Sequence, residues 1–141
     1  PTSIDALAQH RCSSFRHAST GKPMPWEFKI GEEIVARNIA STLICNDVEL
    51  EARAVLAGHA IGQLVGTTAA PLVRAGQLVP LLTAHMADHL GLYVYYGSRT
   101  AQPARVRAFI DLAVERLVGN PQFVLQPHEL TPAKKPRRRA G

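Results

Sequence analysis

The feature that most constrains the fold is the stretch of residues 46–82, NDVELEARAVLAGHAIGQLVGTTAAPLVRAGQLVPLL. Helix signals and short apolar runs alternate along it, with glycines marking the breaks between them. The predicted order is helix, strand, helix, strand, with connections of only a few residues. Such an order is typical of a compact α/β domain.

The stretch begins with a well-marked helix. Asn46 or Asp47 can cap it, because a short side-chain oxygen accepts a hydrogen bond from a free amide of the first turn. Glu49 and Arg53 stand four residues apart with the acid first, the favourable order for an ion pair on a helix. Gly58 follows the run AVLA where a left-handed residue ends a helix.

The second half of the stretch predicts a shorter helix between two strands. Thr67 or Thr68 can cap this helix, and Gly76 closes it. Pro71 is expected early enough in the helix to remove only an amide that has no partner. The flanking strands are expected at residues 61–65 and, as a buried strand, at residues 78–82.

The segments before this stretch predict a helix, two strands and a hairpin. SIDALAQH is expected to form a short helix with Ser3 as its cap, and RCSSFR and NIASTLIC are expected to form strands. HASTGKPMP is a predicted loop. In WEFKIGEEIVAR, Trp26, Phe28 and Ile30 alternate with polar residues before a turn near Gly31, which predicts a hairpin with one apolar face.

The segments after it predict a loop, a strand and the longest helix. TAHMADH is the loop, and LGLYVYY is a strand rich in aromatic and β-branched residues. Pro103 suits the first position of the helix, which stops at Gly119 and Asn120. The helix carries an apolar stripe of Val106, Phe109, Ile110, Ala113 and Leu117.

Length and composition indicate one domain with its own core, since 46% of the 141 residues are hydrophobic. No apolar run approaches the roughly 20 residues of a membrane-spanning helix, and no signal peptide is evident at the N-terminus. We therefore expect a cytoplasmic protein without membrane contact. Cys12 and Cys45 lie in apolar runs, which predicts buried free thiols rather than a disulfide.

The net charge of +5 comes from the C-terminal tail. KKPRRR supplies five of the 16 basic residues, and the others balance the 11 acidic residues. A basic tail interrupted by prolines cannot bury apolar surface, so residues 121–141 are expected to be disordered. Such a tail could add non-specific attraction to DNA, but a solvated tail without a role is the favoured interpretation.

Patterns for catalysis or metal binding are weak. Of the six histidines only His85 and His89 stand close together, and the predicted loop around them does not align their side chains. His10 and Cys12 lack a second pair at ligand spacing. The motifs GxSxG, GxxxxGKS/T and GxGxxG do not occur. The sequence therefore predicts no enzyme activity, no metal and no cofactor.

The pattern as a whole resembles the effector-binding domain of LysR-type transcriptional regulators. The resemblance rests on the order and spacing of IDALAQHRC, WEF with its glycine turn, ND before AVLAGHAIGQLV, APLVRAGQLVPLL, LYVYYGSR and RVRAFIDLAVERL, over residues 3–118. It implies an α/β fold like that of type II periplasmic binding proteins, a three-layer sandwich with a mixed sheet. Two such subdomains, joined by hinge strands, would enclose a small-molecule site.

The resemblance implies that this chain carries only part of that fold. Residues 1–85 would form the second subdomain, residues 86–120 the returning strand and C-terminal helix of the first, and residues 121–141 the tail. The winged helix-turn-helix and most of the first subdomain are absent from these residues. A small-molecule effector, DNA contacted through the missing N-terminal domain, and assembly as a homodimer or homotetramer are the implied partners.

A candidate effector site follows from the predicted strand ends. In open α/β sheets, ligands bind beyond the carboxyl ends of the strands, where loops and helix N-termini meet. Here those ends run into loops or helices that offer hydrogen-bond donors, and free amides of a helix N-terminus favour an anionic group. The residues expected at this site are Arg16, Ser19, Thr20, Asn46, Asp47, Gly66 and Thr67.

The hypothesis is that an organic acid or a similar small metabolite binds there. Arg16 would pair with a carboxylate, and Ser19, Asn46 and Thr67 would orient the ligand by hydrogen bonds. The alternative is that Asn46, Asp47 and Thr67 are helix caps and nothing more.

Two other functional classes stay open at this point. A periplasmic-type solute-binding domain would share the fold, but it requires a secretion signal, and its ligand is cargo rather than an inducer. An α/β enzyme is the less favoured of the two.

Overall fold

Two small β-sheets are present in the computed structural model, which describes residues 1–89, 91, 93–95 and 103–131. One sheet is parallel and consists of β1 (Cys12–Phe15) and β4 (Ser41–Cys45). The other is an antiparallel hairpin of β2 (Trp26–Ile30) and β3 (Glu33–Arg37). The α-helices are α1 (Val48–Leu56), α2 (Gly66–Arg74) and α3 (Ala104–Leu117), and short 3-10 helices span Asp5–Gln9, Thr83–His85 and Pro127–Leu130.

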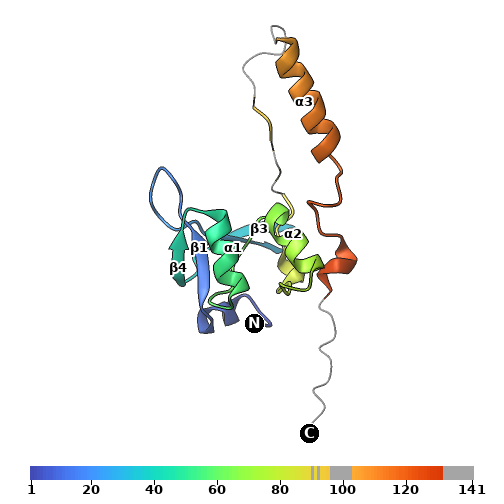
Figure 1. The fold of residues 1–141 in the computed structure, drawn as a ribbon. Coiled ribbons are helices and arrows are strands. Elements are labelled where there is room, and N and C mark those ends of the chain that lie inside the picture. The colour runs from blue at the N-terminus through green and yellow to red at the C-terminus, as the bar shows by residue number, and fades with distance from the viewer. Residues whose placement is uncertain (90, 92, 96–102, 132–141) are drawn as a thin grey trace.

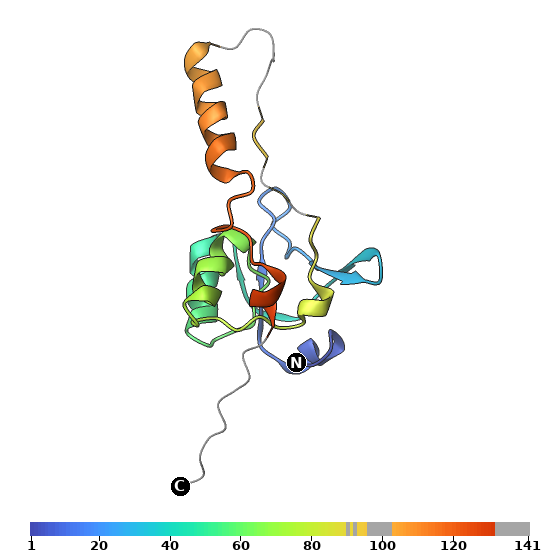
Figure 2. The same cartoon turned by 90° about the vertical axis from the view of Figure 1, so that its right-hand side faces the viewer.

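The described elements form a layered body from which α3 projects. Helix α1 packs on β1, on β4 and against α2, and the hairpin lies on the other side of the parallel pair (Figures 1 and 2). Helix α3 extends away from both sheets in the two views. In the described part of the chain, no helix is long and apolar enough to cross a membrane.

The predicted hairpin is confirmed. Trp26 and Phe28 are buried, with ring centroids 6.2 Å apart, whereas Ile30 at the turn is 41% exposed. Gly31 adopts a left-handed φ of 61°, which glycine permits without strain. The Trp26 Nε1 group donates a hydrogen bond of 3.0 Å to the carbonyl of Ser13, so the hairpin is joined to β1.

The core is centred on the residues that surround this junction. It consists of Leu7, Cys12, Trp26 and Phe28, with Ile4, Ile39, Ile61 and Leu82 packed against it. Leu7 belongs to the opening 3-10 helix, whose N-cap is Ile4 rather than the predicted Ser3, although Ser3 Oγ accepts a hydrogen bond of 3.2 Å from the Ala6 amide. Cys12 and Cys45 are buried free thiols, as expected.

Helix α1 forms as the sequence predicts. Asp47 is the cap, and its Oδ1 atom accepts hydrogen bonds from the amides of Glu49 at 2.8 Å and Leu50 at 2.9 Å. Arg53 pairs with Glu49 at 2.6 Å. Gly58, with a φ of 72°, follows the end of the helix. Local hydrogen bonding therefore fixes both ends of α1.

The prediction of a strand over residues 61–65 is wrong beyond its first residue. Ile61 bridges Cys12 in parallel, and its amide and carbonyl bond to Arg11 and Ser13, but the ladder stops there. The Gln63 side chain instead bonds to both the amide and the carbonyl of Glu27, at 3.0 and 2.8 Å. These bonds direct the chain toward the hairpin rather than along β1.

Helix α2 differs from the prediction at its start. It begins at Gly66 with Val65 as the extended N-cap, and neither Thr67 nor Thr68 caps it through its side chain. Pro71 is consequently the sixth helical residue and occupies an interior position, so the expectation that it removes only a free amide is wrong. Gly76, at a φ of 68°, follows the helix end as predicted.

Residues 78–82 do not form the expected buried strand. The amides of Gln77 and Leu78 bond to the carbonyl of Leu72, which folds the chain back against the end of α2. Val79 is 67% exposed, and Leu82 has a left-handed φ of 52°. The apolar run is therefore used as an irregular connection, from which only Leu82 reaches the core.

The prediction of a strand in LGLYVYY lies partly outside the described residues, which omit Leu90, Leu92 and Tyr96. Gly91 and residues 93–95 belong to no strand, and Tyr95 is 92% exposed.

Helix α3 is confirmed, although Pro103 is its N-cap rather than its first residue. None of the residues of α3 is buried, and Phe109 of the predicted apolar stripe is 66% exposed.

The expectation of a disordered tail is wrong for the segment that directly follows α3. Residues 121–131 are ordered and include the 3-10 helix Pro127–Leu130. Hydrogen bonds rather than burial of apolar side chains hold this segment, because the Arg74 side chain binds it through several of them. Residues 132–141, which contain KKPRRR, lie outside the described part.

Candidate functional site

The parallel pairing of β1 and β4 brings two predicted site residues together. The Arg16 amide, directly after β1, donates a hydrogen bond of 2.6 Å to the carbonyl of Cys45, the last residue of β4. Asn46 follows Cys45, so Arg16 and Asn46 lie at the same edge of the sheet. Both residues are exposed. Among the described residues, neither side chain takes part in a hydrogen bond or an ion pair.

Ser19 and Thr20 belong to the loop that continues from Arg16. The Ser19 hydroxyl lies 3.0 Å from His17 Nδ1, and Thr20 Oγ1 accepts a long hydrogen bond of 3.4 Å from the Lys22 amide. The loop is closed by backbone hydrogen bonds from the His17 amide to the Lys22 carbonyl and from the Gly21 amide to the His17 carbonyl. These two side chains are therefore engaged within the loop.

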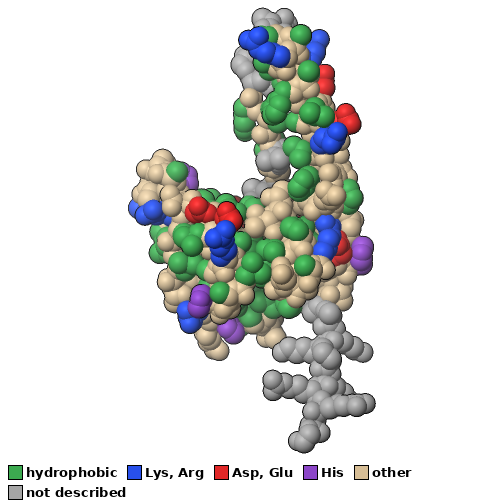
Figure 3. Space-filling model, in the orientation of Figure 1, with side chains coloured by type: hydrophobic (Ala, Val, Ile, Leu, Met, Phe, Trp, Pro, Cys, Tyr) green, Lys and Arg blue, Asp and Glu red, His purple; other side chains and the backbone are tan. Residues whose placement is uncertain are grey.

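Asp47 is committed to the cap of α1, as the fold shows. A shallow surface hollow lies beside this cap and is lined by Asp47, Glu49, Leu50 and Arg53. Acidic and basic side chains meet on this part of the surface (Figure 3). The geometry therefore favours capping of α1 as the role of Asp47. An anionic ligand would be repelled by the negative charge of the Asp47 carboxylate.

Gly66 and Thr67 form the start of α2. The chain reaches α2 from the single bridge at Ile61 by way of Gln63, whose side chain binds Glu27 of the hairpin. A Cβ atom on Gly66 would lie 3.3 Å from the carbonyl oxygen of Phe123, so the segment after α3 closely approaches this turn. No hydrogen bond among the described residues joins Gly66 or Thr67 to Arg16 or Asn46.

A buried polar pair next to this edge was not predicted. Ser13 Oγ donates to Glu51 Oε1 at 2.6 Å, and the two residues are 0% and 4% exposed. The hydroxyl thus compensates part of the cost of burying a carboxyl group. A signal was present, because Glu51 lies one position before Ala52 and four before Val55, on the face that α1 turns to β1.

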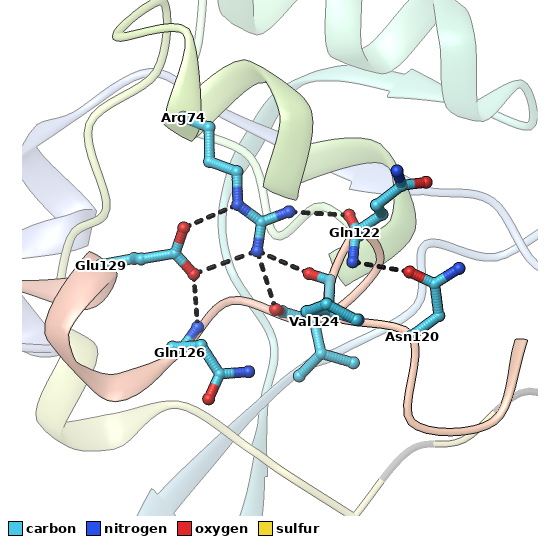
Figure 4. A network of polar contacts seen from close by, with 7 residues as sticks. Arg74, Asn120, Gln122, Val124, Gln126 and Glu129 are labelled. Carbon is cyan, nitrogen blue, oxygen red and sulfur yellow. Dashed lines mark hydrogen bonds and ion pairs between the residues drawn. The ribbon is translucent and has the colours of Figure 1, made fainter.

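A second feature was missed at the end of α2. Arg74 forms an ion pair with Glu129 at 2.6 Å and donates to the carbonyls of Pro121, Gln122 and Val124 (Figure 4). Its hydrogen bond to Glu129, with a second from the Gln126 amide, lowers the pKa of that carboxyl group to about 2. A local signal existed in Gln126 and Glu129, whose spacing is that of a capping box.

No group of three or more potential metal ligands occurs among the described residues. His89 Nε2 lies 3.4 Å from Glu27 Oε2, and His85 Nδ1 lies 3.1 Å from the carbonyl of Lys29, so the two histidines have separate partners. Burial raises the pKa of the Cys12 thiol, which disfavours the reactive thiolate.

Comparison with known proteins decides the family. Residues 1–118 match the LysR substrate binding domain. The chain belongs to this family. This family consists of substrate-binding domains of transcriptional regulators and is not a family of enzymes. The resemblance to LysR-type regulators that the sequence indicated is confirmed.

Similar proteins carry matching descriptions. The chain is 34% identical over 105 residues to the HTH-type transcriptional regulator YcaN of Escherichia coli K12, covering 74% of this chain and 33% of YcaN. It is 31% identical over 111 residues to the HTH-type transcriptional regulator PtxR of Pseudomonas aeruginosa, covering 79% of this chain and 36% of PtxR. The chain thus spans about a third of these two regulators.

A shorter relative is covered more fully. The putative LysR family substrate binding domain-containing protein YagP of E. coli K12 is 29% identical over 106 residues, which are 75% of this chain and 78% of YagP.

Proposed function

We propose that this LysR substrate-binding domain binds a small-molecule effector and, in a full-length regulator, controls DNA binding by a helix-turn-helix domain. The observation that carries the proposal is the family match over residues 1–118, since this domain is the ligand-binding part of such regulators. The relatives are named as HTH-type transcriptional regulators, which favours this reading over a periplasmic-type solute-binding domain. A cytoplasmic location and assembly as a homodimer or homotetramer belong to the same proposal.

The finer architecture is also a proposal. Residues 1–85 would form the second subdomain of a periplasmic-binding-protein-like three-layer sandwich. Residues 86–120 would return to the first subdomain, and the exposed apolar side chains of α3 support this division. A helix with an apolar stripe gains stability only when that stripe is covered, and no described residue covers it fully.

The effector site would lie at the carboxyl edge of β1 and β4. Arg16 would be the charge partner of a carboxylate, because its exposed guanidinium has no ion pair in the described part. Asn46 would orient the ligand from the adjoining strand end, and Thr67 would do so from α2. Ser19 and Thr20 would contribute from the loop by exchanging their present partners.

Calorimetric titration of the chain with a panel of small carboxylic acids tests this proposal. At least one acid should bind, and Arg16→Ala should weaken its binding about tenfold or more, the effect of losing a charge-assisted hydrogen bond. Arg37→Ala is the matched control, since Arg37 is an exposed arginine at the end of β3. Equal affinity of the parent and Arg16→Ala would remove Arg16 as the anchor.

A further inference from the structure

The segment that follows α3 is bound to α2 by one arginine. The Arg74 guanidinium donates to Glu129 Oε1 at 2.6 Å and Oε2 at 3.0 Å. It also donates to the carbonyls of Pro121 at 2.7 Å, Gln122 at 2.9 Å and Val124 at 3.0 Å. All three guanidinium nitrogens are used, as the close view shows (Figure 4). Residues 121–130 are called the strap below.

The strap is also shaped by bonds of its own. Glu129 Oε2 accepts a hydrogen bond of 2.7 Å from the Gln126 amide, so the carboxylate that binds Arg74 also holds the start of the 3-10 helix. The Asn120 side chain accepts from the Gln122 amide at 2.9 Å. These bonds preorganise the carbonyls that Arg74 recognises. Binding of Arg74 and folding of the strap are therefore coupled.

The strap contacts a side chain from the last residue of α2 and approaches the first residue of the same helix. Arg74 is the last residue of this helix, and Gly66 is the first. At Gly66, the carbonyl oxygen of Phe123 is so close that an added Cβ atom would be 3.3 Å away. The same short stretch of the strap therefore binds the Arg74 guanidinium and lies beside the first residue of α2.

The Arg74–Glu129 pair is partly shielded from solvent. The side chains are 32% and 18% exposed, in contrast to 73% and 75% for the Arg53–Glu49 pair on α1. Shielded ion pairs that use several hydrogen bonds contribute more than exposed ones, which add little to stability. The lower exposure of the Arg74–Glu129 pair indicates that Arg74 stabilises the position of the strap, which is what we mean by calling Arg74 its lock.

We infer that residues 121–130 form a releasable strap, locked by Arg74, which places the Phe123 carbonyl beside Gly66 at the start of α2 and anchors the end of α3 to the body of the domain. Loss of the Arg74 guanidinium would free the strap as a unit, because the other hydrogen bonds of the strap among the described residues lie within residues 120–130. Release would remove the Phe123 carbonyl from beside Gly66 and leave the end of α3 without its attachment to α2. The inference does not depend on the identity of the effector.

Hydrogen exchange of the full chain near pH 7 tests the strap. In Arg74→Gln, the amides of Phe123, Gln126 and Glu129 should exchange about tenfold faster or more, and those of the first turn of α2 should also speed up. The Ser13 amide, bonded to Ile61, serves as a reference inside the same molecule. Arg53→Gln is the matched control, because it breaks an exposed pair of the same chemistry.

The outcomes separate clearly. Fast exchange confined to the strap and the first turn of α2 supports the lock. Unchanged strap exchange in Arg74→Gln, or equal acceleration in Arg53→Gln, overturns it. If Arg74→Gln also loses protection at Ser13, Glu129→Gln and Arg74→Lys decide. Both should speed amide exchange in the strap while Ser13 stays protected, and a uniform loss of protection in both would also overturn the inference.

Discussion

Ser13 Oγ on β1 lies 2.6 Å from Glu51 Oε1 on α1, and neither residue is more than 4% exposed. This hydrogen bond joins the central strand to the helix that begins at the candidate effector site. The Ser13–Glu51 hydrogen bond therefore both stabilises the fold and holds α1 in place beside the candidate site.

Replacement of Ser13 by alanine should lower the free energy of unfolding by about 1.5–3 kcal/mol, because a buried carboxyl group loses its hydroxyl partner. Urea unfolding measures the effect. Ser14→Ala is the control, since Ser14 is equally buried but bonds only to the neutral hydroxyl of Ser41 at 2.6 Å. Its cost should be smaller, about 0.5–1.5 kcal/mol. Equal losses in the two variants would contradict a special role for the Ser13–Glu51 pair.

Gly62→Ala should destabilise the domain by about 1–3 kcal/mol through overpacking. A Cβ atom at this position would lie 2.8 Å from Val55 Cγ2 and 2.9 Å from Ser13 Oγ, too close for either neighbour to stay in place. Thermal unfolding of Gly62→Ala, Val55→Ala and the double variant measures the clash. The double variant should lose less stability than the sum of the single changes, and full additivity would argue against the contact.

Acidification should release the strap only at a pH below the range in which carboxyl groups usually titrate. The pKa of Glu129 is lowered to about 2 by Arg74 and the Gln126 amide, with a smaller contribution from His128. A lowered pKa in the folded state adds stability that is complete above the ordinary value of 4.5 and is lost as the pH falls toward 2. NMR titration of the Gln126 amide should follow this loss. The change should be absent in Glu129→Gln, and a midpoint near 4.5 in the parent would contradict the lock.

Cys12 and Cys45 should react with a thiol reagent such as DTNB on the order of tenfold or more slowly in the native chain than in urea. Both thiols are buried, and burial raises the pKa of Cys12. The rates of DTNB labelling in native buffer and in denaturant measure the difference. Rapid labelling of either cysteine in the native chain would show that the core around β1 opens readily.

Local signals predicted the fold well where hydrogen bonds within a few residues decide it. The Asp47 cap, the Glu49–Arg53 pair and the turn at Gly31 all depend on such bonds, and all were expected. Residues 61–65 and 78–82 were predicted wrongly because hydrogen bonds that an apolar run does not reveal decide their paths. The Gln63 side chain binds Glu27 in the hairpin, and the Leu78 amide bonds back to the Leu72 carbonyl in α2.

The candidate site was predictable in part. Parallel pairing does bring Arg16 and Asn46 to one edge, as strand-end reasoning expects. The use of Asp47 as a cap was one of two alternatives that sequence alone left open, and the structure favours it. The Arg74 network was not foreseeable from spacing, because its two charged partners are 55 residues apart and the bond requires the strap to turn back onto α2.

The most direct test of the account is NMR of the labelled chain during titration with the carboxylic acid that binds it. The account predicts the largest shifts at the Arg16 side-chain Nε and the amides of Arg16, Asn46 and Thr67, with little change at Arg37 on β3. Shifts centred on the hairpin or on α3, with Arg16 unmoved, would contradict an effector site at the carboxyl edge of β1 and β4.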